Sequence, residues 1–102
     1  MSPTLVVNRR YEAYDVYIGR PSRWGNPFSH VGLPDDRMGS RYRTVRVKTR
    51  DEAIERYREW IQTQPQLLAA LHELRGKRLG CWCAPKRCHG EILAELADAL
   101  EV

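Results

Sequence analysis

The segment from Gly19 to Ser40 constrains the fold most, because no regular helix or strand is expected to run through it. Prolines and glycines recur along its length: Pro21, Gly25, Pro27, Gly32, Pro34 and Gly39. Proline fixes φ and removes a backbone donor, so it interrupts helices and central strands alike. We therefore predict one long structured loop without regular elements. Loops of this length are uncommon in compact domains unless they are functional or disordered.

Short strands are predicted on both sides of this loop. Leu5 to Val7 and Asp15 to Ile18 have β-branched or aromatic residues where a buried strand needs them. Tyr42 to Val47 alternates enough between polar and apolar residues to form an edge strand, although a loop is an alternative.

Helices dominate the second half of the chain. Thr49 and Glu52 have the spacing of a capping box, and apolar residues recur behind them at helical spacing, which predicts an amphipathic helix over residues 50–62. Thr63 and Pro65 then have the residue types of a cap and a first helical position, so they predict the start of a second helix.

Gly76 closes this second helix in the prediction, because glycine adopts the left-handed conformation that ends helices. A strand from Lys77 to Cys83 and a last helix from Glu91 to Leu100 follow. The resulting order, β-β-(β)-α-α-β-α, predicts a small layered fold of the α/β or α+β class.

The composition indicates a single folded domain over residues 1–102. Hydrophobic residues make up 42% and charged residues 29% of the chain, which is ordinary for a globular protein. No apolar run approaches the roughly 20 residues that span a bilayer, and no secretion signal is recognisable at the start. We expect a cytoplasmic protein that does not bind membranes.

Positive charge is concentrated in one part of the sequence. The net charge is +4, and the stretch from Arg37 to Arg50 contains basic residues and no acidic one. A basic face attracts phosphate-bearing partners, so a nucleotide or a nucleic acid is the expected ligand. The alternative is a solvated strand with alternating arginines.

The three cysteines lie in one short segment, residues 81–89, which we call the cysteine segment. An odd number of clustered thiols in a chain without a secretion signal favours metal or thiol chemistry over disulfides. Cys81 and Cys83 share one face of the predicted strand, and Cys88 and His89 come at the start of the last helix. Three thiols and one imidazole are the ligand set of a closed tetrahedral zinc site, although their spacing is tighter than usual.

Two alternatives stay open for the cysteine segment. Cys88 at a helix N-terminus, beside Lys86, Arg87 and His89, would have a lowered pKa and could act as a catalytic nucleophile or help cradle an anion. Otherwise Cys81 and Cys83 are small core residues, and Cys88 is a residue near the helix cap, all without a chemical role.

The second candidate site is the sequence GRPSRWGNPF at residues 19–28, which we call the arginine loop. Arginine guanidinium groups suit phosphates, and Trp24 and Phe28 offer faces on which a base could stack. The alternative is that both aromatic rings fill the core while the arginines bond to carbonyl groups. The predicted ligand-binding residues are Gly19, Arg20, Ser22, Arg23, Trp24, Asn26, Arg43 and Arg46.

Two motifs carry a resemblance to a known family: VYIGRPSRWGNPF at residues 16–28 and ELRGKRLGCWCAPKRCHGEIL at residues 73–93. They resemble the family catalogued as domain of unknown function 4326, and the resemblance extends over most of the chain from about residue 16 to residue 100. It implies no established activity. Members are similar to small proteins encoded by bacteriophages and actinobacteria.

Three functions are compatible with these observations. The first is a module that binds a nucleotide or nucleic acid through the arginine loop, with the cysteine segment as a zinc clamp. The second is a thiol- or metal-dependent enzyme that acts on a nucleotide or modified base. The third is a phage-encoded protein that binds a host factor. We also predict that the two segments meet, because both follow strands whose carboxyl ends collect ligands in open α/β sheets.

Overall fold

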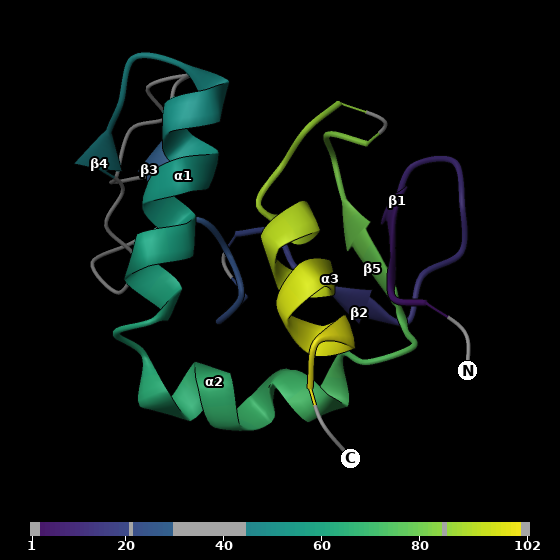
Figure 1. Cartoon of the computed structure of the whole chain (residues 1–102). Helices are drawn as coiled ribbons and strands as arrows, with labels where there is room; N and C mark the ends of the chain where they lie inside the picture. The colour runs from purple at the N-terminus through teal and green to yellow at the C-terminus, as the bar shows by residue number, and fades with distance from the viewer. Residues whose placement is uncertain (1–2, 21, 30–44, 85, 101–102) are drawn as a thin grey trace.

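A parallel three-stranded sheet organises the chain (Figure 1). This computed structural model describes residues 3–20, 22–29, 45–84 and 86–100. The strand order is β1 (Leu5–Asn8), β5 (Arg78–Cys81), β2 (Val16–Tyr17), and both β1 and β2 pair in parallel with β5. Since the three strands are parallel, the residues that follow β2 and β5 leave the sheet at the same end, where the carboxyl ends of the strands lie.

The helices begin and end close to where the sequence predicts. Helix α1 (Arg50–Ile61) has the Thr49 hydroxyl accepting a bond from the Glu52 amide at 3.0 Å, as the capping box requires. Helix α2 (Pro65–Ala70) begins with Pro65, but its N-cap is Gln64 and not Thr63. A 3₁₀ helix, η2 (Leu71–Glu73), continues it, and Gly76 has a φ of 74° where the helical segment is closed.

Helix α3 (Gly90–Asp98) packs on one face of the sheet (Figure 1). A Cβ atom at Gly90 would come within 2.7 Å of Ile18 and 3.0 Å of Val6, so glycine is what lets the helix start so close to the strands. Along β5, Leu79 and Cys81 belong to the core on this side. Because neighbouring strand residues point to opposite faces, Gly80 lies on the other face, where the ring of Tyr14 covers it.

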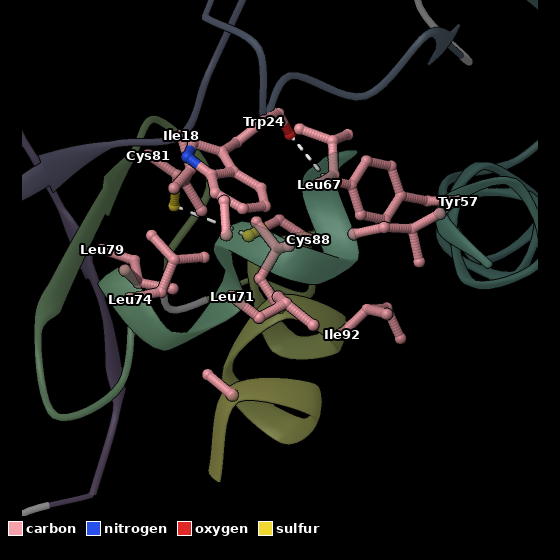
Figure 2. Close-up of a cluster of buried hydrophobic side chains, with 14 of the residues drawn as sticks. Ile18, Trp24, Tyr57, Leu67, Leu71, Leu74, Leu79, Cys81, Cys88 and Ile92 are labelled. Atoms are coloured by element: carbon pink, nitrogen blue, oxygen red, sulfur yellow. Dashed lines mark hydrogen bonds between the residues drawn. The ribbon is translucent and has the colours of Figure 1, made fainter. Parts of the chain in front are cut away.

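The core continues from the sheet to α1 and α2. The side chains in Figure 2 come from all of these elements and include Trp24 of the arginine loop, which is 3% exposed. The Trp24 carbonyl accepts a hydrogen bond from the buried hydroxyl of Tyr57 in α1 at 2.8 Å. The arginine loop is therefore anchored to the core through Trp24.

The prediction that residues 19–40 contain no regular element is wrong. Phe28 and Ser29 form β3, which pairs in parallel with β4 (Val45–Arg46). Pro27 does not prevent this, because a proline before a strand lacks only its own amide, and its carbonyl still accepts a bond from Val45. The predicted strand 42–47 is confirmed only at its end, since residues 42–44 lie outside the described residues.

Strand β5 is shorter than the predicted strand 77–83. It ends at Cys81 because its neighbour β1 ends opposite, at Asn8. The side-chain amide of Asn8 then bonds to the carbonyl groups of Trp82 and Ala84, at 3.2 and 3.0 Å. Beyond Cys81, hydrogen bonds from the Asn8 side chain thus replace the backbone hydrogen bonds between the strands. Cys83 therefore does not extend strand β5 beyond Cys81.

The described part of the chain contains no helix long and apolar enough to cross a membrane.

Candidate functional site

A cavity of about 330 Å³ lies where β2 and β5 end. The arginine loop and the cysteine segment both line it, together with residues of α1. The loop contributes Gly19, Arg20, Asn26 and Phe28, and the segment contributes Cys81, Trp82, Cys83, Arg87, Cys88 and His89. The two segments therefore meet, as their positions after parallel strands predict.

Arg20 is the cavity arginine with an unmet hydrogen bond. Its Nη1 atom is buried and has no hydrogen-bond partner among the described residues, and no ion pair holds the guanidinium there. Its backbone is fixed, because the Tyr17 hydroxyl donates to the Arg20 carbonyl at 2.9 Å. A Cβ atom at Gly19 would clash with this tyrosine ring. Gly19 thus allows Tyr17 to brace the backbone that carries Arg20.

Arg87, which lines the same cavity, is compensated by carboxylates. It bonds to Asp51 at 2.8 Å and to Glu91 at 3.1 Å, and Glu55 is 4.0 Å away. Its carbonyl accepts a bond from Arg50 at 3.2 Å, so the two arginines join α1 to the cysteine segment. The carboxylates neutralise the charge of Arg87, which therefore has a structural role. The charge of Arg20 is not neutralised in this way by any described residue.

Cys81 and Cys88 form a buried thiol pair (Figure 2). The Cys88 thiol donates to the Cys81 sulfur at 3.6 Å, and the Ala84 amide donates to the same sulfur at 3.4 Å. The bond from Cys88 lowers the pKa of Cys81 to about 6, against the opposing effect of burial. The hydrogen bond from Cys88 thus favours the thiolate form of Cys81.

The pKa of Cys88 is raised, not lowered as its place near a helix N-terminus predicts. The thiol gives its proton to the bond with Cys81, and its interactions with Cys83 and its burial raise the pKa further. The Gly90 amide at the start of α3 does donate to its sulfur, at 3.3 Å, but this favourable contact is outweighed. Cys81 is accordingly the better candidate for a thiolate.

His89 holds the arginine loop against α3. Its Nε2 atom lies 2.7 Å from the carbonyl oxygen of Ile18, and its ring centroid is 4.9 Å from that of Tyr57. A carbonyl can only accept, so Nε2 carries the proton in this bond. Burial lowers the pKa of His89 to about 4, which keeps the ring neutral at pH 7.

This arrangement does not favour the predicted zinc site of Cys81, Cys83, Cys88 and His89. In the described residues no group of three or more histidine, cysteine or acidic side chains is placed to hold a metal ion. The Nε2 atom of His89 bonds to a carbonyl, and its ring packs in the core. The four-ligand zinc clamp stays a prediction that metal analysis can test.

Several residues of the arginine loop have structural partners. Arg23 is exposed, bonds to Glu73 at 2.7 Å and lies over the Trp24 ring. Asn26 faces the cavity, but its amide donates to the Ala53 carbonyl and accepts from the Phe28 amide. Trp24 packs in the core, as the alternative interpretation predicts, and its ring is not a stacking face in the cavity.

The remaining predicted ligand-binding residues lie apart from the cavity or outside the description. The Ser22 hydroxyl is buried without a hydrogen-bond partner among the described residues, but Ser22 does not line the cavity. Arg46 is exposed in β4 and is also absent from the lining. Arg43 lies outside the described residues.

The predicted site residues omit five that line the cavity with polar or aromatic side chains: Tyr17, Phe28, Arg50, Trp82 and Arg87. Tyr17 had a usable signal, because it lies near the end of a predicted strand, two residues before the arginine loop. The chain distance from Arg50 to both motifs left no comparable signal.

Comparisons with known proteins agree on one family. Residues 6–99 match the family described as "Domain of unknown function (DUF4326)". The chain is also similar to the "Uncharacterized 12.4 kDa protein in nrdA-td intergenic region" of Enterobacteria phage T4, with 39% identity over 95 residues, which covers 93% of this chain and 78% of the phage protein. No solved structure matches the chain.

Proposed function

Because the chain belongs to a family described only as a domain of unknown function, we propose a function from the site itself: the protein binds a nucleotide in the strand-end cavity, with Arg20 on the phosphate. The observation that carries this proposal is the buried Nη1 atom of Arg20 without a hydrogen-bond partner among the described residues. A buried donor left unpaired costs about 1–3 kcal/mol. An anionic ligand would recover this free energy.

Charge in the cavity supports an anion. Arg20, Arg50 and Arg87 line it, and no acidic side chain is among its described lining residues. The carboxylates that compensate Arg87 come from outside the lining. Arginine binds phosphate oxygens through a planar fork of donors, which suits this group better than a single point charge.

Size and aromatic walls support a nucleoside attached to that phosphate. About 330 Å³ lies at the lower end of the roughly 300–1,000 Å³ typical of small-molecule sites. Tyr17 and Phe28 line the cavity and offer apolar ring surface to a base or sugar. The position at the carboxyl ends of parallel strands is the usual one for ligands of open α/β sheets.

Isothermal titration calorimetry with nucleotides, the matching nucleosides and inorganic phosphate tests this function. We expect nucleotides to bind and the nucleosides to bind at least tenfold more weakly. Arg20→Gln should weaken nucleotide binding by roughly tenfold to a hundredfold, the range expected for a charged hydrogen bond. The matched control is Arg23→Gln in the same loop, because Arg23 points to Glu73 and does not line the cavity.

Two results would overturn the proposal. One is the absence of binding by every nucleotide even at low ionic strength, where phosphate contacts are strongest. The other is nucleotide affinity that Arg20→Gln leaves unchanged.

A second candidate function, thiol catalysis on the bound nucleotide or base, is favoured by one observation. Cys81 lines the cavity, and its sulfur accepts hydrogen bonds from Cys88 and from the Ala84 amide. A thiolate stabilised in this way is a nucleophile at neutral pH. In this function Cys81 is the candidate nucleophile and Cys88 stabilises its charge, which reverses the predicted role of Cys88.

A further inference from the structure

Aromatic side chains surround Arg9 on the sheet face opposite α3. The Arg9 guanidinium carbon lies 4.8 Å from the ring centroids of both Tyr17 and Trp82, and 5.4 Å from that of Tyr14. Gly80 makes room for this group, because a Cβ atom there would clash with Tyr14 at 2.6 Å. We call Arg9, Tyr14, Tyr17 and Trp82 the aromatic platform.

The platform is ordered by its own contacts and yet open to solvent. The indole nitrogen of Trp82 donates to the Tyr17 hydroxyl at 3.2 Å, which fixes the ring. The Trp82 residue is nevertheless 58% exposed, which among the exposed large hydrophobic residues of the described ranges is second only to Tyr11 at 75%. A large ring held in place at this exposure offers stacking surface at little cost in side-chain entropy.

The platform is continuous with the cavity. Tyr17 and Trp82 belong to both, because they lie at the ends of β2 and β5 where the cavity opens. A ligand that fills the cavity and extends out of it would meet the platform next.

The charge of the platform is positive. Arg9 and Arg10 form no ion pair with any described residue, and Arg10 lies over the exposed ring of Tyr11. Cationic groups beside exposed aromatic rings suit a chain of alternating phosphates and bases, whose bases stack on rings without regard to sequence.

We propose that the natural ligand is single-stranded nucleic acid: one nucleotide occupies the cavity, the neighbouring base stacks on Trp82, and the phosphate between them meets Arg9. This inference rests on the nucleotide binding proposed above and extends it to the substrate class. A single strand is required, since both faces of a base inside a duplex are stacked on the neighbouring bases and cannot lie on an exposed ring.

Calorimetry with a mononucleotide, a dinucleotide and a five-residue single strand, all with the same terminal nucleotide, tests the inference. A blunt duplex of the same sequence is the fourth probe. In the wild type the second nucleotide should tighten binding by about tenfold, as one added stacking contact predicts. The duplex should show no such gain.

Two variants locate the gain on the platform. Arg9→Gln and Trp82→Ala should each reduce the ratio of dinucleotide to mononucleotide affinity toward one. The matched control is Leu5→Ala, an exposed apolar residue at the amino end of β1, which should keep the full ratio. Thermal melting of all three variants verifies that they fold, and the ratio within each variant cancels any common loss.

The outcomes separate this inference from the proposed function. If mononucleotides bind but a second nucleotide adds nothing, nucleotide binding stands and the extension to a single strand is overturned. A gain that persists in both platform variants, or an equal gain with the duplex, also overturns it. If neither mononucleotides nor single strands bind, both proposals are wrong.

Discussion

The arginine loop and the cysteine segment line one cavity but differ in how their polar groups are satisfied. In the loop, Arg20 has a buried nitrogen without a partner among the described residues. In the segment, Cys88 donates to Cys81, and His89 bonds to the Ile18 carbonyl. The reactive side chains of the cysteine segment are therefore hydrogen-bonded to other groups of the protein. The arginine loop contains the buried donor that is left unpaired among the described residues.

Removal of the His89 side chain should have the largest effect on stability. His89→Ala leaves the Ile18 carbonyl without its donor and a void beside Tyr57, so we expect a loss of about 3 kcal/mol in the free energy of unfolding. Urea denaturation measures it. The control is His72→Ala, an exposed residue whose loss should change stability by less than about 0.5 kcal/mol. A similar small change for His89→Ala would contradict a structural role.

The pH dependence of the free energy of unfolding should show the burial of His89. Burial lowers the pKa of His89 from 6.5 to about 4, so between these values the unfolded chain binds a proton that the folded protein does not. The contribution of the neutral His89 ring to stability is therefore present above pH 6.5 and is lost as the pH falls toward 4. From pH 7 to pH 5 the wild type should lose about 2 kcal/mol more than His89→Gln. Urea titrations at pH 7 and pH 5 measure these losses. If the wild type and His89→Gln lose the same free energy of unfolding, His89 takes up its proton in the folded protein as readily as in the unfolded chain.

Thiol labelling should rank the cysteines within the segment. At pH 7, iodoacetamide should modify Cys81 at least tenfold faster than Cys88, because the pKa of Cys81 is lowered to about 6 and that of Cys88 is raised. Peptide mass spectrometry after brief labelling gives both rates. Cys88→Ala should slow the labelling of Cys81, since it removes the S–H donor that stabilises the Cys81 thiolate. Faster labelling of Cys88 would restore it as the candidate nucleophile.

The unlabelled protein tests the zinc clamp, because alkylated thiols cannot bind the metal. Native mass spectrometry should find about one zinc ion per chain if Cys81, Cys83, Cys88 and His89 form the predicted site, and a chelator should then lower the melting temperature. Metal-free protein with a fast-reacting Cys81 would exclude the clamp and favour the thiol pair.

The smallest effect is expected in the arginine loop, at Arg23. This residue is exposed and its ion pair with Glu73 is on the surface, so Arg23→Ala should cost no more than about 0.5 kcal/mol. Nucleotide affinity should change by less than twofold. Denaturation and calorimetry on one preparation measure both. A loss of affinity comparable to that of Arg20→Gln would place Arg23 in the binding site and weaken the contrast drawn between the two residues.

The parts of the fold that depend on local sequence were predicted well. The capping box of Thr49 and Glu52 and the left-handed Gly76 act over a few residues, and the structure confirms both. The meeting of the two segments was also predictable, because it follows from parallel strands. The pair β3 and β4 was missed, since a two-residue pairing between distant segments leaves no periodic pattern.

The amino-acid sequence by itself determined the positions of the three helices, the start of α1, and the end of the sheet at which the arginine loop and the cysteine segment lie. Only the tertiary structure decided which arginine faces the cavity, since Arg20 and Arg23 are three positions apart in one loop and differ by the partner each one meets. It likewise decided which thiol is acidic. Hydrogen bonds between Cys88 and Cys81, and between His89 and Ile18, join residues from different elements, and burial changes their pKa values only once those elements pack.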